Sequence, residues 1–89
     1  MSLQQLTQDL ARGRLRLTTM DDGSAVLLDA EGEALFSLNK TARFVVEQVR
    51  DGAETLDELA KRLAEAFEVD LVQAREDAQS FIDELTATL

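Results

Sequence analysis

Few side chains in this sequence could carry out covalent or acid–base chemistry. The 89 residues contain no His and no Cys, which excludes zinc sites built on imidazole or thiolate, thiol nucleophiles and Ser-His-Asp arrangements. Carboxylates are plentiful, with Asp+Glu 18 against Lys+Arg 9, so the composition permits only a hard-cation site. We predict that the protein is not an enzyme and has no catalytic residues, no metal and no cofactor.

A short uncharged segment is better suited to binding than to catalysis. It lies between Glu33 and Lys40 and consists of Ala34, Leu35, Phe36, Ser37 and Leu38. Proteins usually protect an exposed strand edge with charge, Pro or a bulge, and this segment contains neither charge nor Pro. If it forms an edge strand, it could pair with an extended peptide or with another copy of the chain.

The side chains of this segment have a simpler explanation than ligand contact. In a strand, Phe36 and Leu38 share one face and Leu35 lies on the other. We expect Phe36 and Leu38 to face the helices, where burial of about 2 kcal/mol each accounts for them without a ligand. The backbone groups of the segment are therefore the better candidates for binding.

Three strands are predicted in the first half of the chain. Polar and apolar residues alternate over 14–18, and strand-like runs follow at 24–28 and 34–38. Turn signals lie between them at 21–23 and 29–32. Short strands joined by tight turns indicate an antiparallel meander.

Helical spacing replaces this pattern after Leu38. Asn39 can cap a helix that stops at Asp51-Gly52, and Thr55 to Glu58 fit the capping box of a second helix. A third helix opens at Asp70 and runs close to Leu89. We predict an α+β fold that is winged helix-turn-helix-like, with a three-stranded antiparallel sheet followed by three helices.

The acidic charge argues against a nucleic-acid partner. The net charge is −9, and residues 51–89 contain eleven acids against Lys61, Arg62 and Arg75, which gives −8. Affinity for DNA comes mostly from Lys and Arg, so a winged-helix transcriptional regulator is disfavoured. An acidic adaptor protein is a second alternative. An acyl carrier would need an exposed Ser at a helix start, which does not fit Ser2, Ser24, Ser37 or Ser80.

The sequence shows no feature of a membrane or secreted protein. No apolar run approaches the roughly 20 residues needed to cross a bilayer. The residues that follow Met1 lack the basic region and apolar stretch of a secretory signal. We expect a cytoplasmic protein without a membrane partner.

An ordered set of short motifs extends over most of the chain. It starts with the segment from Leu38 to Ala42, continues with Asp51-Gly52 and with Thr55 to Leu59, and ends with Leu63, Phe67, Asp77, Phe81 and Leu85. In this order, over residues 14–86, the sequence resembles the PqqD-like family, which are small peptide chaperones also called RiPP recognition elements. The N-terminal segment is not part of the family's minimal pattern.

The resemblance implies a protein without catalysis of its own. Members of the family bind the leader segment of a ribosomally made precursor peptide and deliver it to a modifying enzyme, often a radical SAM enzyme. They bind the leader as an extra strand on the third strand, with its side chains against the third helix. Asp77 matches the family's Asp, for which we expect a structural role in accepting backbone hydrogen bonds.

The third helix carries two neighbouring stripes of residues. We expect the first to form core, and it consists of Leu71, Ala74, Ala78, Phe81 and Leu85. We predict that the second forms a wall of the peptide groove, and it consists of Val72, Arg75, Gln79 and Ile82. Val72 and Ile82 would contact leader side chains, and Arg75 would pair with an acid of the leader. The alternative is a boundary stripe that contacts no ligand.

The N-terminus is predicted to be a separate helical piece. Leu3, Leu6 and Leu10 form one stripe, Ser2 is a candidate N-cap and Gly13 a candidate stop. We therefore divide the chain into an N-terminal helical extension, residues 1–13, and a PqqD-like peptide-recognition domain, residues 14–89. A leucine stripe on a short helix needs a partner surface, so we also consider a homodimer formed through this segment.

Overall fold

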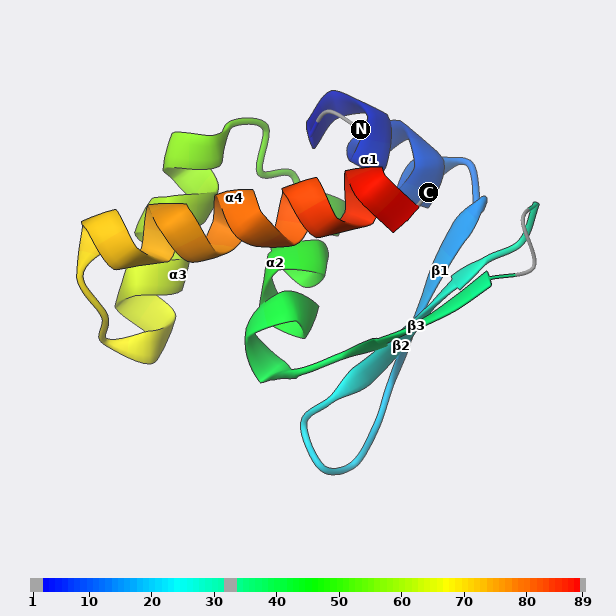
Figure 1. Cartoon of the computed structure of the whole chain (residues 1–89), viewed down its shortest axis with the longest axis horizontal. Coiled ribbons are helices and arrows are strands. Elements are labelled where there is room, and N and C mark those ends of the chain that lie inside the picture. Colours follow the sequence, from blue (N-terminus) through cyan, green and yellow to red (C-terminus); the bar gives the residue numbers. More distant parts are fainter. Residues whose placement is uncertain (1–2, 32–33, 89) are drawn as a thin grey trace.

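The computed structural model describes residues 3–31 and 34–88 and confirms the predicted α+β fold (Figure 1). A helix precedes three strands, and three helices follow them. In chain order the elements are α1 (Leu3–Ala11), β1 (Leu15–Thr19), β2 (Ala25–Asp29), β3 (Ala34–Leu38), α2 (Lys40–Arg50), α3 (Leu56–Phe67) and α4 (Leu71–Thr88). The first two strands start one residue later than predicted. The candidate N-cap Ser2 and the flanking Glu33 lie outside the described residues.

The sheet is an antiparallel meander in the order β1-β2-β3. Leu27 of β2 pairs with Leu17 of β1 on one side and with Phe36 of β3 on the other. As predicted, Leu38 is buried and Phe36 packs against the core, whereas Leu35 on the opposite face is 63% exposed. One face of the sheet therefore lies on the helices and the other is open.

The core lies between the sheet and the three C-terminal helices. Figure 1 shows α2 between the sheet and α3. Val46 and Val49 of α2 are fully buried, as is Leu27 of β2, and Leu59 and Leu63 of α3 are almost so. Burial of one such side chain stabilises the fold by about 2 kcal/mol. These apolar contacts hold α2 against the sheet, and α2 in turn positions the two helices that follow.

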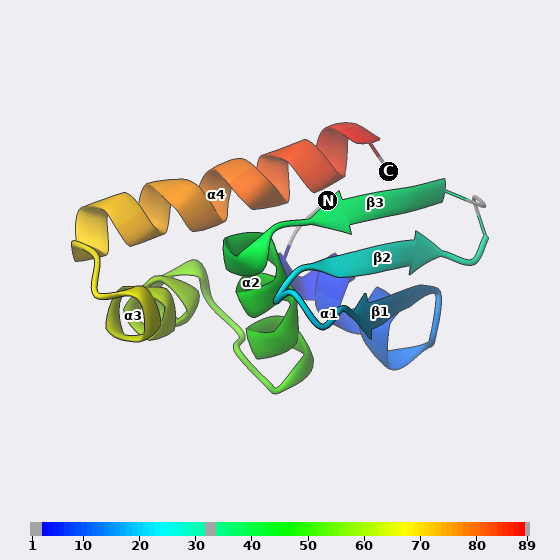
Figure 2. The same cartoon turned by 90° about the horizontal axis from the view of Figure 1, so that it is seen from below.

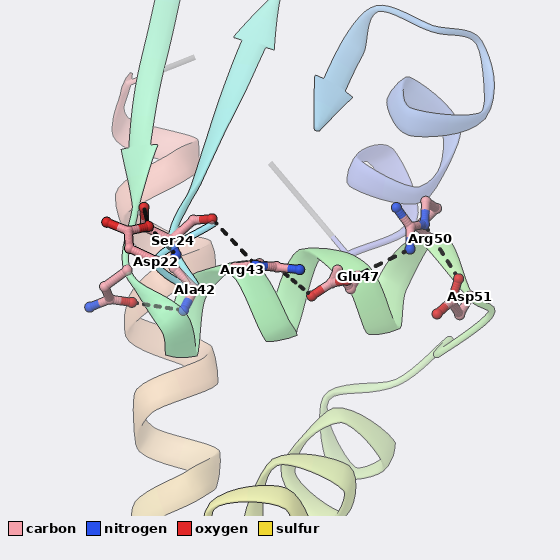
Figure 3. Close-up of polar contacts among 8 residues, drawn as sticks. Asp22, Ser24, Ala42, Arg43, Glu47, Arg50 and Asp51 are labelled. Carbon is pink, nitrogen blue, oxygen red and sulfur yellow. Dashed lines mark hydrogen bonds and ion pairs between the residues drawn. The ribbon is translucent and has the colours of Figure 1, made fainter. Parts of the chain in front are cut away.

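The start of α2 is fixed by a cap and by an arginine. Asn39 Oδ1 accepts the N–H of Ala42 at 2.8 Å, which satisfies a free N–H of the first turn. Arg43 donates through Nη1 to the carbonyl of Ser24 at 3.5 Å and through Nε to Glu47 at 3.1 Å (Figure 3). The hairpin between β1 and β2 is thereby attached to α2.

The turn of that hairpin has its own hydrogen bonds. The hydroxyl and the N–H of Ser24 both donate to Asp22 Oδ1 (Figure 3), and these bonds lower the pKa of Asp22 below its usual value. Gly23 has a φ of 93°, and a Cβ there would lie 2.7 Å from Cε of Lys40. The turn favours glycine for its backbone conformation, whereas the flexible Lys40 side chain could move away from a Cβ.

Hydrogen bonds also define the end of α2. Gly52 has a φ of 114°, and its N–H donates to the carbonyl of Val49 at 3.2 Å. The N–H of Ala53 donates to the carbonyl of Gln48 at 2.9 Å, and Ala53 itself is buried. This is the Schellman motif that the Asp-Gly pair predicts.

The start of α3 has the predicted capping residues with one difference. Thr55 Oγ1 accepts the N–H of Glu58 at 3.1 Å, and Glu58 in turn accepts the N–H of Glu54 at 3.2 Å. In the usual capping box the second bond goes to the cap residue itself. Here it goes one residue further back, so the segment ahead of the cap is also held.

The side chains of α4 differ from the prediction in two places. Ile82 is buried at 6% exposure, together with Ala74, Ala78 and Leu85. Leu71 was expected in the core but is 48% exposed. Spacings of four, four and three residues put Ile82 in line with the two alanines, so it belongs to the core stripe and Phe81 lies at its border.

The helix α1 packs on the same core and does not stand apart. Leu6 is fully buried, and Leu3 and Leu10 pack against the core. The leucine stripe therefore has a packing surface within the chain, and the homodimer that it suggested stays a prediction.

Buried carboxylates further attach α1 to the sheet. Asp9 is fully buried and accepts hydrogen bonds from Gln5 and Arg12, each at 3.0 Å. Arg14 lies between two acids, with Nη1 3.6 Å from Asp9 Oδ2 and Nε 3.5 Å from Asp29 Oδ1. A buried carboxylate without a cation would be strongly unfavourable, so Arg14 keeps α1 and the end of β2 together.

A non-glycine residue in the left-handed region allows a test of this fold. Glu68 ends α3 with a φ of 53°, which costs an L-residue about 1–2 kcal/mol. We predict that Glu68→Gly stabilises the protein by about 0.5 kcal/mol, because the relief exceeds the extra chain entropy of glycine. Urea unfolding measures the change.

The matched control is Glu65→Gly, made in the exposed interior of the same helix. It should destabilise the protein by about 1 kcal/mol. Equal destabilisation by both substitutions would contradict the assigned conformation of Glu68.

Candidate functional site

One edge of the sheet has backbone groups that point away from the other strands. The N–H of Ala30 donates to the carbonyl of Arg14 at 2.8 Å, and that of Met20 to Ser24 at 2.9 Å. Hydrogen-bonded pairs alternate along an antiparallel ladder, so Ala25, Leu27 and Asp29 direct their backbone groups toward β3. The β3 residues opposite them are Leu38, Phe36 and Ala34.

The remaining two residues of β3 must therefore face outward. Leu35 and Ser37 direct their N–H and C=O groups away from β2, and β3 is the last strand in the order of the described sheet. Both side chains are exposed. The edge thus offers two donors and two acceptors along a strand with no charged residue.

A hollow of about 370 Å³ lies beside this edge. Figure 2 shows α4 running alongside β3. The hollow is bordered by the end of β3, the start of α2 and the second half of α4, and its lining consists of Ser37, Leu38, Asn39, Thr41, Ala42, Asp77, Ser80, Phe81 and Glu84. An extended chain paired with β3 would place alternate side chains toward α4.

The lining combines an aromatic ring with acidic and neutral polar groups. Phe81 is half-buried and packs against the core. Asp77 and Glu84 are exposed on either side of it along α4. Asp77 Oδ1 accepts a hydrogen bond from Nε2 of Gln73 at 2.9 Å, which is a side-chain partner and not the backbone partner that the sequence suggested.

Comparison with known proteins shows the family of this chain. The profile for "Coenzyme PQQ synthesis protein D (PqqD)" matches residues 24–88, which is most of the chain. The chain belongs to the PqqD family. The match begins just before β2 and includes β3 and all three C-terminal helices, so the open edge and the hollow both lie in the family region.

Two solved structures have the same fold as this PqqD-family chain. "TbiB1 in Complex with the TbiA(beta) Leader Peptide" has a TM-score of 0.74 at 17% identity, and covers 84% of this chain and 85% of its own. "Lasso peptide synthetase B1 complexed with the leader peptide" has a TM-score of 0.69 at 28% identity, and covers 84% and 86%. Comparison with curated protein sequences gave no significant match.

The structure separates the two sets of predicted site residues. Residues 34–38 form the edge strand, and Ser37 and Leu38 line the hollow. Val72 and Arg75 instead line a different hollow of about 360 Å³ between α3 and α4, where Arg75 forms an ion pair with Asp57. In the PqqD-family chain these two residues are therefore not beside β3.

The other two predicted groove residues are also placed differently. Gln79 is exposed and donates to Asp83 Oδ1 at 2.9 Å, and Ile82 lies in the core. The α4 residues beside β3 are Asp77, Ser80, Phe81 and Glu84. These residues and the predicted groove residues lie on opposite sides of the core stripe of α4. The sequence would have indicated the correct side if Ile82 had been assigned to the core stripe.

Neither a metal site nor a membrane span is found in the part of the chain that the structure describes. Within residues 3–31 and 34–88, no group of three or more Asp or Glu side chains could hold a metal ion. The helices of that part of the chain are all too short or too polar to cross a membrane.

The assignment of the outward residues predicts an exchange pattern. In the free protein, the amides of Leu35 and Ser37 should exchange with solvent deuterium much faster than that of Phe36, which is bonded to β2. Amide exchange followed by NMR on the uniformly labelled protein measures this. Slow exchange at all three positions would mean that the edge is already paired, for example by self-association.

Proposed function

We propose that this chain is a non-catalytic peptide chaperone that binds the leader segment of a ribosomally made precursor peptide. The leader adds to the sheet as a strand along β3, with Leu35 and Ser37 supplying the backbone hydrogen bonds. The outward-facing edge beside the hollow is the observation that carries the proposal. Membership of the PqqD family and the leader-peptide complexes of two similar structures support it.

The energetics of strand addition to β3 predict moderate affinity for the leader peptide. Each backbone hydrogen bond contributes about 0.5–1.5 kcal/mol net, and the two outward residues make four at most. Apolar contact with Phe81 adds to this, whereas ordering of the peptide and loss of its free motion oppose it. A dissociation constant on the order of micromolar is expected.

The bound leader would then be presented to a separate modifying enzyme. The family resemblance favours a radical SAM enzyme, and such a chaperone would act in the cytoplasm, where precursor peptides are made. The chain itself needs no cofactor for this role, because all of its contribution is binding and positioning.

Direct binding to DNA is a poor alternative for this fold. Arg62 of α3 donates to Glu58 at 2.8 Å and to Gln48 at 3.0 Å, and Arg75 pairs with Asp57. Two of the three bases in residues 51–89 are thus bonded to the chain's own side chains. Phosphate would meet an acidic surface.

A proline at the open edge tests strand addition. Ser37→Pro removes an outward N–H and adds bulk on the binding side, but it removes no bond to β2. We predict at least a tenfold loss of affinity for a leader peptide that the unmodified chain binds, with candidates taken from any short reading frames found near its gene. Calorimetric titration of the full chain measures this, and circular dichroism checks the fold.

Thr19→Pro is the matched control, because alternation also makes Thr19 an outward residue on the opposite edge strand β1. It should leave leader affinity within about twofold of the original. The proposal is wrong if Ser37→Pro binds the leader as tightly as the unmodified chain, or if both proline variants lose affinity equally while folded.

Presentation to the enzyme is tested separately. We predict that a bound leader, this chain and a radical SAM enzyme that modifies the same precursor form a ternary complex in sedimentation, and that Ser37→Pro releases the leader from it. Binding of the leader without any complex with that enzyme would reject the radical SAM partner and leave peptide binding intact.

A further inference from the structure

The open face of the sheet carries two exposed apolar side chains. Where an antiparallel sheet has one face on the core and the other in water, the outward side chains are normally polar. Here Leu35 of β3 is 63% exposed and Leu28 of β2 is 37% exposed. The two residues stand opposite each other in the register of the sheet, so their side chains lie side by side on the same face.

The chain itself does not cover this pair of leucines. In the part of the chain that the structure describes, the core and the side chains packed on it include neither Leu28 nor Leu35. The neighbour of Leu28 on β1 is Arg16, which is exposed. Beyond β3 the described sheet has no further strand. Leu35 therefore has an apolar neighbour on β2 and no cross-strand neighbour on its outer side.

The backbone geometry fixes which side chain of a bound peptide would meet Leu35. Because the N–H and C=O groups of Leu35 point outward, a strand paired with β3 has one residue directly opposite it. Residues opposite each other in a sheet share a face, with Cβ atoms about 4.5–5.5 Å apart. The side chain of that peptide residue would therefore lie on the open face beside Leu35, and it would point away from α4.

The other outward residue of β3 offers a different contact. Ser37 is exposed and stands opposite Val26 of β2, which is half-buried. A peptide residue opposite Ser37 would meet a hydroxyl group, whereas one opposite Leu35 would meet an aliphatic side chain with Leu28 beside it. The apolar contact on this face is therefore concentrated at one position of the bound strand.

We propose that the chain selects leader segments with an apolar side chain, above all a β-branched or aromatic one, opposite Leu35 on the side that faces away from α4. This rests on the proposed function, and it makes Leu35 a specificity-determining residue of the same site. An apolar cross-strand pair is more favourable than a pair with a polar partner. A second copy of the chain could also supply a strand, but the net charge of −9 on each copy opposes that pairing.

The test uses two blocked peptides, Thr-Thr-Val-Leu-Val-Thr-Thr and Thr-Thr-Thr-Leu-Thr-Thr-Thr. When the central Leu faces α4, both of its neighbours lie on the open face, and one of them is opposite Leu35 whichever way the peptide runs. Val and Thr are both β-branched and similar in shape, so the peptides differ in polarity. Each is titrated into the ¹⁵N-labelled full chain, and affinity is taken from the amide shifts of residues 35 and 37. We expect the Val peptide to bind about fivefold more tightly.

Three variants locate the origin of this preference. Leu35→Thr should bring the two affinities within about twofold of each other, whereas Leu35→Ile should keep the preference for Val. The matched control is Val72→Thr, which removes an equally exposed apolar side chain, at 65%, from a part of α4 outside the hollow beside β3. It should also keep the preference, because distant sites act independently. The amide spectrum of each variant checks the fold.

The remaining outcomes separate this proposal from the proposed function. If the Val and Thr peptides shift the two amides at equal affinity, apolar selection is overturned and strand addition stands. Selection by Leu35 is also overturned if Leu35→Thr keeps the preference, or if Val72→Thr loses it equally. If the free chain sediments as a dimer that Leu35→Thr dissociates, a second copy covers the face and the proposal is wrong. If neither these peptides nor any candidate leader shifts the two amides, the proposed function itself fails.

Discussion

In an antiparallel sheet, every second residue of an edge strand directs its backbone N–H and C=O groups away from the neighbouring strand. In β3 these residues are Leu35 and Ser37. In a soluble protein such groups are normally hydrated, and charge or Pro usually discourages other chains from pairing with them. Here the strand is uncharged and lies beside a hollow formed by the end of β3, the start of α2 and α4. This arrangement supports the proposed peptide capture, because a strand that paired with the edge would also gain side-chain contacts.

The rest of the fold fixes the position of the β3 edge relative to the hollow. A single residue, Asn39, separates β3 from α2, so the cap on α2 also determines where the strand ends. Arg43 attaches the β1–β2 turn to the same helix. At the opposite edge of the sheet, just before β1, Arg14 links α1 to the end of β2 through the buried carboxylates of Asp9 and Asp29. β3 is therefore supported at its end and through its neighbour β2, although its outer edge is left open.

Much of this architecture could be predicted from local signals. The strands and helix ends were predicted to within a residue or so from short-range features, whose physical effects do not depend on distant residues. These features are the alternation of polar and apolar residues, the Asp51-Gly52 pair, and the capping residues Asn39 and Thr55. The facing of Phe36 and Leu38 also followed from strand periodicity. The family resemblance, now confirmed, rested on the same motifs in order.

The residues that the structure places differently from the prediction depend on the packing of one helix against others. On α4 the choice between Phe81 and Ile82 as the core residue decides which flank faces β3, and both are apolar. The structure buries Ile82 and leaves Leu71 exposed, so the predicted groove residues Val72 and Arg75 lie between α3 and α4 instead. The docking of α1 on the core was likewise a long-range contact, which a leucine stripe cannot distinguish from a dimer interface.

The brevity of β3 has a kinetic consequence. Only two of its five residues present backbone groups to a partner, so an attached peptide has few bonds to break before it leaves. With a typical association rate constant of about 10⁶ M⁻¹s⁻¹ and micromolar affinity, the residence time would be on the order of a second. Such a carrier would hold its cargo long enough for a handover and then be free for the next molecule.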